Sequence, residues 1–297
     1  MKHAFLVIAH SEVYILNILL NQLQHPDITI FVHCDYKSEL AYEIEKLTET
    51  YGGIYIKDRI SVYWGTDSQI KCELKMFKTA FSGGYDYYHL VSGADLLVKP
   101  VSEFLSFIEK HSGQEFFSVD SDLDNMYNAY IKMNYHYFFL KKYKGKSLIS
   151  RVSRKLSKLL VQIQRLIGFR RVKDGDIKLF KGHNWVSLTN HAVGYILSKE
   201  DWITKRFQRT FCPDEIYKQT ILMNSHFADN RFVSDDLEQS SNLRLIDWNR
   251  GTPYLWRAVD KEQLLTTSNF IARKFSTNED KSVIDWLSTE IKNNDTK

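Results

Sequence analysis

The sequence predicts an α/β protein built on an open, mostly parallel β-sheet. Two short runs, 3–10 and 28–33, are almost wholly apolar, as parallel strands covered on both faces should be. Apolar residues at helical spacing follow the first run, and a second helical stretch over 39–50 follows the next. This alternation is typical of a parallel sheet, in which ligands bind beyond the carboxyl ends of the strands.

Each element of the first half has its own signal. Pro26 ends the first helix, because proline cannot continue it, and Gly83-Gly84 ends a later one. His10, Asp35 and Ser38 follow the first two strands, so this order places them on the binding edge of the sheet. We expect strands at 3–10, 28–33, 53–56, 85–91 and 115–119, and helices at about 15–23, 39–50, 70–81 and 104–108.

The second half continues with shorter elements. Neither an internal repeat nor a linker is visible, so we expect one domain over residues 1–297. Gly93 follows the central strand, and a small residue there indicates a close approach of the backbone to a ligand. We expect strands at 182–189 and 243–248, a compact basic element at 271–275, and helices at 190–198, from 213, at 260–267 and at about 282–293.

The charge of the chain is unevenly distributed. The formal net charge is +4, but residues 141–173 contain twelve Lys or Arg and no Asp or Glu. The remainder therefore carries about −8 (4 − 12), so the basic stretch is a local feature.

The cysteines and the apolar runs favour a cytoplasmic protein. Cys34, Cys72 and Cys212 match neither a zinc spacing nor a disulfide framework, which indicates a reducing compartment. The apolar run at the start is too short for a signal peptide, and no run is long enough to span a bilayer.

Residues 147–169 predict a basic amphipathic helix. Three interpretations of 141–171 stay open: a solvated basic face on a packed helix, a helix lying on anionic lipid, and a nucleic-acid-binding helix. We favour peripheral contact with an anionic membrane and expect no nucleic acid, because no nucleic-acid-binding motif is present. The apolar face of the helix comprises Ile149, Val152, Leu156, Leu159, Ile163 and Leu166.

Glu215 is the candidate catalytic residue. Pro213 suits the first turn of a helix, where its missing N–H is not needed, and an acid in that turn is favoured by the helix dipole. A carboxylate on a rigid helix start is what a general base requires. The competing interpretation is an ordinary helix-capping Glu.

Several stretches together make the chain similar to the core-2/I-branching N-acetylglucosaminyltransferase family, which includes the peptide-O-xylosyltransferases. Residues 31–38 are like the family's I-H-V-D-x-K-S, and 85–100 are like its L-x-G-x-D-x-P-x-K. These stretches lie in the family's order and cover most of the chain, but 125–178 has no match. The other matching stretches are 4–10, 62–68, 181–187, 212–222 and 243–275.

The resemblance implies a GT-A-type glycosyltransferase fold. This is a Rossmann-like mixed sheet flanked by helices, with 1–120 as the nucleotide-sugar half and 175–297 as the acceptor and catalytic half. The basic stretch 141–173 would be a helical insertion between them. The resemblance also implies inverting transfer from a UDP-sugar to a hydroxyl, without a metal or other cofactor.

Residue roles follow from the same resemblance. Glu215, the acid of the P-D-E motif, is implied to be the base. Asp35 is implied to contact the nucleotide, together with His10 and Ser38 at the same edge, although Asp35 could simply cap the next helix. Asp95 is implied to lie near the acceptor, and capping is again the alternative.

Basic side chains are implied to take the place of a metal at the diphosphate. Lys274 belongs to the family's A-x-K-F element, and Arg244 is the Arg near the last strand. Arg250 competes with Arg244, because the alignment there needs a gap. Cations at this place would stabilise the charge that develops on the departing diphosphate.

Tryptophans at strand ends or in turns are candidates for stacking on a sugar. We assign Trp185 and Trp248 to acceptor binding, with Trp64 as a further candidate, although large aromatic residues are more often part of a core.

Some positions depart from the family pattern. Leu97 stands where Pro is usual, Cys212 where Ser or Thr is usual, and His183 where Ser is usual. The chain also lacks the disulfides and the membrane anchor of the animal members. The donor sugar and the acceptor therefore do not carry over directly.

A metal-dependent transferase is the alternative within the same fold. Asp120 and Asp122 form an Asp-x-Asp pattern after a predicted strand, and many GT-A enzymes hold Mn²⁺ in this way. A non-catalytic nucleotide- or carbohydrate-binding relative is a second alternative. The sequence as a whole favours an inverting, metal-independent bacterial transferase. It would move GlcNAc, or else xylose, to a glycan or lipid-linked oligosaccharide in surface-polysaccharide synthesis.

Overall fold

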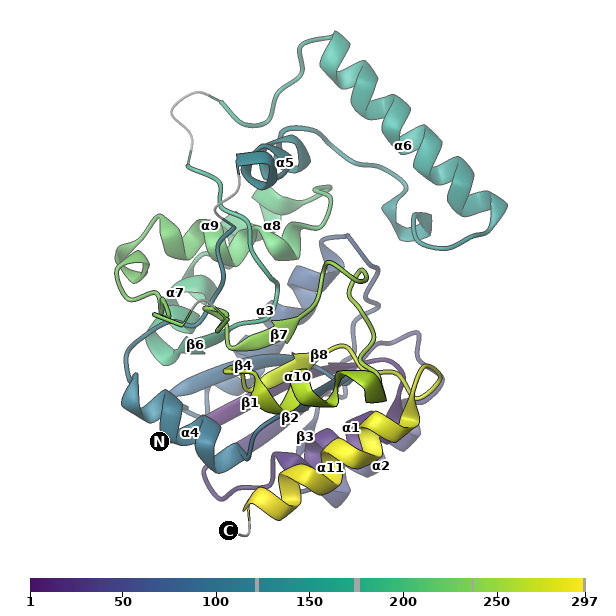
Figure 1. Cartoon of the computed structure of the whole chain (residues 1–297). Coiled ribbons are helices and arrows are strands. Elements are labelled where there is room, and N and C mark those ends of the chain that lie inside the picture. Colours follow the sequence, from purple (N-terminus) through teal and green to yellow (C-terminus); the bar gives the residue numbers. More distant parts are fainter. Residues whose placement is uncertain (121–122, 174–176, 237, 296–297) are drawn as a thin grey trace.

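The computed structural model (Figure 1) describes residues 1–120, 123–173, 177–236 and 238–295. The main sheet has the strand order β3-β2-β1-β4-β6, in which β6 is antiparallel to β4 and the other pairs are parallel. The predicted α/β class with a Rossmann-like mixed sheet is therefore confirmed. The strands are β1 His3–Ala9, β2 Ile28–Cys34, β3 Ile54–Tyr55, β4 Tyr87–Ser92 and β6 Ser187–Thr189.

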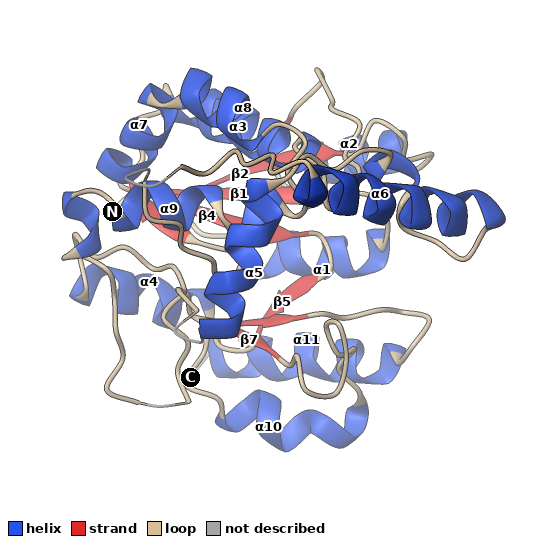
Figure 2. Cartoon of the chain, turned by 90° about the horizontal axis from the view of Figure 1, so that it is seen from above, coloured by secondary structure: helices blue, strands red, loops and turns tan. Residues whose placement is uncertain are grey.

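Helices cover both faces of this sheet (Figure 2), which explains the continuous apolar run in β1. Phe5 and Val7 belong to one core cluster, whereas Leu6 and Ile8 belong to the other, because successive side chains of a strand point to opposite faces. The first cluster includes residues of α1 Val13–Gln22, α2 Ala41–Thr50, α4 Val101–Lys110, α10 Lys261–Thr266 and α11 Lys281–Asp295. The second includes residues of α3 Ser68–Phe81, α7 Asn190–Ser198, α8 Glu200–Phe207 and α9 Tyr217–Met223.

A second, three-stranded sheet has the order β5-β8-β7. β5 (Asp95–Leu97) follows β4 directly, and it pairs antiparallel with β8 (Ile271–Arg273), which pairs parallel with β7 (Arg244–Ile246). The strand predicted at 243–248 is confirmed in shorter form as β7, and the compact basic element expected at 271–275 contains β8. β5 was not predicted, because a three-residue strand leaves no clear alternation in the sequence.

The basic stretch forms an insertion at the end of the molecule opposite α11 (Figure 1). The predicted basic helix is confirmed as α6, and the side chain of Ser147 caps its first turn by accepting a hydrogen bond from the backbone N–H of Ser150. α5 was not predicted. The elements of the insertion are α5 Leu123–Asn134, the 3₁₀ turn Leu140–Lys142 and α6 Leu148–Leu166.

Three other predictions need correction. The strand expected at 115–119 is wrong: Glu115 and Phe116 form isolated bridges to Arg231 and Ser187. The helix expected from Pro213 begins with a 3₁₀ turn, Pro213–Glu215, and α9 starts after it. α8 was not predicted at all.

Over the described part of the chain, no helix combines the length and apolar composition that crossing a bilayer requires.

Candidate active site

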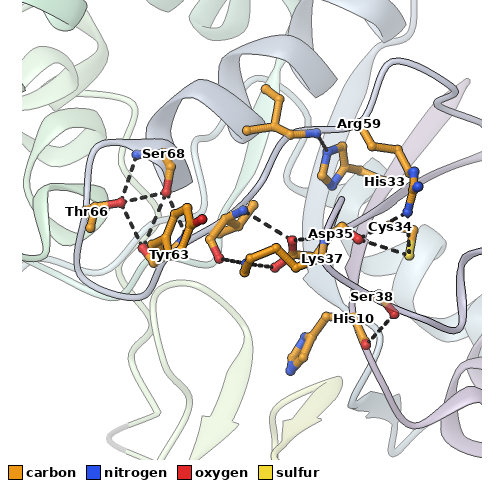
Figure 3. A network of polar contacts seen from close by, with 12 residues as sticks. His10, His33, Cys34, Asp35, Lys37, Ser38, Arg59, Tyr63, Thr66 and Ser68 are labelled. Atoms are coloured by element: carbon orange, nitrogen blue, oxygen red, sulfur yellow. Dashed lines mark hydrogen bonds and ion pairs between the residues drawn. The ribbon is translucent and has the colours of Figure 1, made fainter. Parts of the chain in front are cut away.

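The carboxyl ends of β1, β2 and β4 meet at one edge of the main sheet. The strand register places Ala9 opposite Cys34, so His10 and Asp35 follow neighbouring strands at the same level, as predicted. The hydroxyl of Ser38 donates a hydrogen bond to the carbonyl of His10 at 2.8 Å. Figure 3 shows the imidazole of His10 extending away from this contact. Ser38 therefore connects the ends of the two strands.

The carboxylate of Asp35 bonds to groups of the loop that follows it. It accepts hydrogen bonds from the backbone N–H of Lys37 at 2.9 Å and of Val62 at 3.4 Å, and it pairs with the ammonium of Lys37 at 2.6 Å. Asp35 is only 9% exposed, and α2 has no side-chain cap. The capping alternative is therefore wrong, and the predicted contact between Asp35 and a nucleotide stays a prediction.

A tight turn after Val62 brings a distant segment to this edge. The hydroxyl of Thr66 donates to the carbonyl of Tyr63 at 2.9 Å, which closes the turn (Figure 3). Gly65 then accepts a hydrogen bond from the backbone N–H of Cys212 at 3.0 Å. The segment that contains Glu215 is thereby held beside the nucleotide half.

Glu215 ends the 3₁₀ turn with its carboxylate near two ammonium groups. Lys132 Nζ donates to Glu215 Oε2 at 3.2 Å, and Lys181 Nζ lies 4.0 Å from the same oxygen. Burial lowers the pKa of Lys132, but the charges of Glu215 and Cys212 and the hydrogen bond to Glu215 together outweigh this effect, so the pKa is raised overall. The side chain of Glu215 is 32% exposed, so an acceptor could reach it.

A buried ion pair between α3 and α9 lies next to this 3₁₀ turn. Lys218 of α9 contacts Glu73 of α3 at 2.5 Å and the side-chain oxygen of Asn184 at 2.6 Å, and Lys218 and Glu73 are both fully buried. Lys218 Nζ also reaches the carbonyl of Asp214 at 3.3 Å. Removing one partner of such a pair leaves an uncompensated buried charge, so the pair fixes the backbone next to Glu215.

Asp95 holds an arginine that the sequence did not single out. Its carboxylate is 1% exposed, and it accepts hydrogen bonds from the backbone N–H of Ser92 at 2.8 Å and from Arg273 at 2.6 Å. The guanidinium of Arg273 also lies over the ring of Trp185, 4.4 Å from its centroid. The carboxylate of Asp95 is therefore buried and positions Arg273, and a place for Asp95 near the acceptor stays a prediction.

Gly93 has a structural explanation. A Cβ at this position would lie 3.0 Å from the Cβ of Ala9, so glycine lets β4 and β1 approach each other where they end. This close approach of two protein segments replaces the expected approach to a ligand.

Lys274 follows Arg273 and lies within electrostatic range of His10. Burial, followed by the charges of Arg273 and Lys144, lowers the pKa of Lys274. Desolvation, followed by Lys274, likewise lowers the pKa of His10, although Asp35 opposes this effect and Lys144 adds to it. Lys144 belongs to the insertion, and its ammonium lies over the ring of Trp64 at 5.7 Å. The basic insertion thus brings a cation to the edge of the sheet.

The two tryptophans assigned to the acceptor lie on the same side as Glu215. The indole N–H of Trp248 donates to His183 Nε2 at 3.1 Å, and Trp248 is 47% exposed. Glu215 lies close enough to His183 to affect its pKa, which burial lowers overall. Trp185 is partly exposed beside Arg273. Acceptor binding by Trp185 and Trp248 stays a prediction, with suitable positions for both.

The two arginines predicted to bind the diphosphate, Arg244 and Arg250, both bond to other groups of the protein. Arg244 is 2% exposed, and its guanidinium donates to Ser187 Oγ at 2.9 Å and to backbone carbonyls. Arg250 pairs with Asp247 and Asp260, each at 2.5 Å, beside α10. Both guanidinium groups therefore bond to protein partners, and diphosphate binding by Arg244 or Arg250 stays a prediction. Arg273, one residue before Lys274, is the arginine at the edge of the sheet.

The described residues do not favour the metal-binding alternative. Asp120 pairs with Lys181 at 2.6 Å, and Asp122 lies outside the described residues. No group of three or more His, Cys, Asp or Glu suited to a metal occurs within the described ranges. That activity needs no metal nevertheless stays a prediction.

A continuous chain of contacts joins the predicted groups. It runs from Asp35 through the Val62–Gly65 turn and Cys212 to Glu215, and the backbone N–H of Gly182 donates to the carbonyl of Glu215 at 2.9 Å. From there it continues through the 183–185 segment to Arg273 and Lys274. Two surface cavities lie away from this chain, one lined by Lys71 and neighbouring residues of α3 and α8, the other beside α10.

Comparison with known proteins was informative at the level of the family. A model of the core-2/I-branching enzyme family matches residues 3–264, which include the turn of Glu215 but end before Lys274. One matching solved structure is a putative glucose-1-phosphate thymidylyltransferase from Bacillus anthracis in complex with a sucrose. It has 10% identity and a TM-score of 0.33, and the match covers 69% of this chain and 78% of that one. No curated protein matches the chain.

Proposed function

Since the chain belongs to the core-2/I-branching enzyme family and is therefore a glycosyltransferase, we propose that it is an inverting, metal-independent transferase of the GT-A type. Its donor is a UDP-sugar, with GlcNAc as the first choice and xylose as the second, and its acceptor is a hydroxyl of a glycan. The position of Glu215 supports this proposal most directly. It is a partly exposed carboxylate on a braced turn, beside the edge formed by the nucleotide half.

Glu215 acts as the general base in this proposal. Its carboxylate takes the proton of the acceptor hydroxyl while the oxygen attacks the anomeric carbon from the side opposite the UDP. The new C–O bond forms as the bond between the anomeric carbon and the phosphate oxygen breaks, so the configuration inverts. Lys132, which donates to Glu215 at 3.2 Å, orients the carboxylate for this step.

The departing UDP carries away the electron pair and gains negative charge. Lys274 and Lys144 have no carboxylate partner within 4.0 Å among the described ion pairs, and both act electrostatically on His10. Cations already in place at this point would stabilise the transition state more than the bound donor. Arg273 is held by Asp95 next to Lys274 and completes the positive group.

The acceptor is proposed to be a precursor of a bacterial surface polysaccharide, either free or linked to a lipid, and the enzyme to work in the cytoplasm. The exposed indole of Trp248 and the partly exposed ring of Trp185 are the proposed surfaces for stacking on acceptor sugars. A lipid-linked acceptor would bring the enzyme to the inner face of the cytoplasmic membrane.

Glu215→Gln tests the catalytic part of the proposal. The amide keeps the shape of the side chain but cannot accept a proton, so we expect turnover to fall by about 10²–10⁴-fold while UDP binding persists. Turnover would be measured with UDP-GlcNAc and UDP-xylose by release of UDP, and binding by calorimetry. Glu109→Gln, an exposed change on α4, is the matched control.

Two results would contradict the proposal. Full turnover of Glu215→Gln would remove the assigned base. Tight binding of UDP or a glycan by the wild type, without transfer to any acceptor tested, would favour the non-catalytic relative instead.

A further inference from the structure

α6 packs against the protein with its polar face and exposes its apolar face. Its buried positions are Ser150, Ser153, Ser157 and Val161. At about 100° per residue these positions share one side of the helix, and the large apolar residues share another. Those apolar residues are exposed: Leu148, Ile149, Val152, Leu156, Leu159, Ile163 and Leu166, followed by Ile167. A helix that merely covers a core has the opposite orientation.

Specific hydrogen bonds hold α6 in this orientation. The side-chain amide of Gln164 accepts a hydrogen bond from the backbone N–H of His136 and donates one to its carbonyl, each at 2.8 Å. Arg154 donates to the carbonyls of Tyr143 and Gly145 at 2.8 Å, and the hydroxyl of Ser150 donates to the backbone carbonyl of Lys144 at 3.2 Å. These polar contacts lie on the inner side, so they keep the apolar side turned outward.

The apolar side of α6 is flanked by cations. Arg151, Lys155, Lys158 and Arg165 are exposed along the helix, and the segment before it adds further lysines. Residues 141–173 include no acid. No residue of α6 belongs to either core cluster among the described residues.

We propose that α6 is a membrane-docking surface whose partner is a bilayer containing anionic lipids. The apolar stripe would enter the boundary between head groups and acyl chains, while the flanking Lys and Arg contact lipid phosphates. A second copy of this chain fits less well, because facing α6 helices would bring two acid-free basic stripes together. A nucleic acid would use the cations but would leave the leucines exposed to water.

This docking goes beyond the proposed sugar transfer and can be tested without any donor or acceptor. The purified full chain would be sedimented with vesicles of neutral lipid alone and with vesicles containing about 30% anionic lipid. We expect binding to the anionic vesicles at about 0.05 M salt, and a marked loss at about 0.5 M salt, because salt screens the phosphate contacts.

Two variants separate the apolar contribution from the charged one. Val152→Ser with Leu156→Ser, Leu159→Ser and Ile163→Ser removes the stripe, and Arg151→Glu with Lys155→Glu and Lys158→Glu reverses the flank. We expect each to lower the partition coefficient by about tenfold or more. The matched apolar control carries Ile54→Ser, Val233→Ser, Val259→Ser and Leu265→Ser. The matched charge control carries Lys57→Glu, Lys110→Glu and Lys199→Glu.

Circular dichroism melting would establish that each variant is folded. Absence of wild-type binding, equal binding to neutral vesicles, or unchanged binding of both α6 variants would overturn the proposal. Loss of a dimer in analytical ultracentrifugation on removing the stripe, without vesicle binding by the wild type, would also overturn it and identify a second copy as the partner.

Discussion

Asp214 and Glu215 are neighbours in the sequence, but their carboxylates meet different surroundings. Glu215 reaches Lys132 and Lys181 at the surface. Asp214 is half-buried, and desolvation, followed by the charges of Glu215 and Glu73, raises its pKa to about 7. One carboxyl of the P-D-E motif therefore has a partly exposed, lysine-bound position suited to a base, and the other titrates near neutral pH.

The raised pKa of Asp214 predicts how stability depends on pH. The folded state binds a proton that the unfolded state has released above about pH 4, so this contribution is complete below that pH and is lost as pH rises through about 7. Between pH 6.5 and 8.5 we expect the free energy of unfolding to fall by about 0.8 kcal/mol through this group. Asp214→Asn should flatten the fall, as measured by urea unfolding.

The comparison with Asp214→Asn, and not the pH window, separates Asp214 from the histidines. Burial lowers the pKa of His3 and His33 to about 4, so each adds stability as pH rises through the unfolded value near 6.5, and the variant retains this rise. Burial also lowers the pKa of His10, His89, His136 and His183, which act in the same direction. Burial also raises the pKa of Glu115 to about 7. Glu115 therefore lowers the free energy of unfolding over the same pH range, and the Asp214→Asn variant retains this contribution. Asp201→Asn on the surface of α8 is the control. A fall in Asp214→Asn as steep as in the wild type would contradict this assignment.

At the scale of elements, two separate pieces of the chain bring cations to the edge of the sheet. β8 ends with Arg273 and leads to Lys274, and its pairing with β5 places Arg273 opposite Asp95. The insertion contributes Lys132 from α5 and Lys144 from the segment before α6. The stretch 125–178, in which the motifs gave no match although the family model spans it, thus contributes to both ends of the proposed reaction.

Lys144→Ala should weaken UDP binding through loss of a phosphate contact. A charge-assisted contact contributes about 1.5–3 kcal/mol, so we expect the Kd of UDP to rise by about tenfold or more. Binding of uridine, which lacks phosphates, should not change. Isothermal calorimetry would compare both ligands, with Lys274→Ala as a positive comparison and Lys142→Ala as the control in the same segment.

Equal weakening of UDP and uridine would contradict the phosphate contact and indicate a general disturbance of the insertion. A different result would be an unchanged Kd for UDP in Lys144→Ala together with a raised Kd in Lys274→Ala. It would place the diphosphate contact at Lys274, after β8, and not at Lys144 of the insertion.

At the scale of the whole molecule, the proposed site draws on distant parts of the chain. The main sheet provides the edge with His10 and Asp35, Lys274 follows β8 of the second sheet, and Glu215 belongs to the 3₁₀ turn before α9. A ligand that contacts these parts together stabilises the folded chain as a unit, because it binds the folded state alone.

UDP should therefore raise the melting temperature without a metal. At about 100 times its Kd, the expected stabilisation is about 2.7 kcal/mol, or roughly 4 °C for a chain of this size. Differential scanning fluorimetry with UDP-GlcNAc, UDP-xylose and UDP would measure the shift, with and without EDTA. Turnover measured in parallel should survive EDTA.

Loss of turnover in EDTA that Mn²⁺ restores would instead support the metal-dependent alternative through Asp120 and Asp122. A control nucleotide-sugar with another base, such as GDP-mannose, should leave the melting temperature unchanged.

Local sequence was sufficient for several features. The apolar runs of β1 and β2 predicted the parallel sheet, and the strand order placed His10 and Asp35 at one edge. The P-D-E turn predicted an exposed acid at a helix start, although its first turn is 3₁₀. The spacing of apolar residues predicted α6 to within a few residues. Each of these signals lies within one continuous stretch of chain.

Tertiary structure decided which side chains reach the site and which face of α6 is covered. Arg244 and Arg273 lie on neighbouring strands of one small sheet, but only the three-dimensional packing buries Arg244 against carbonyls and places Arg273 on Asp95. Likewise, amphipathicity identifies two faces of α6 without indicating that its serines pack inward. Both outcomes depend on contacts between residues far apart in the sequence, and local periodicity carries no information about such contacts.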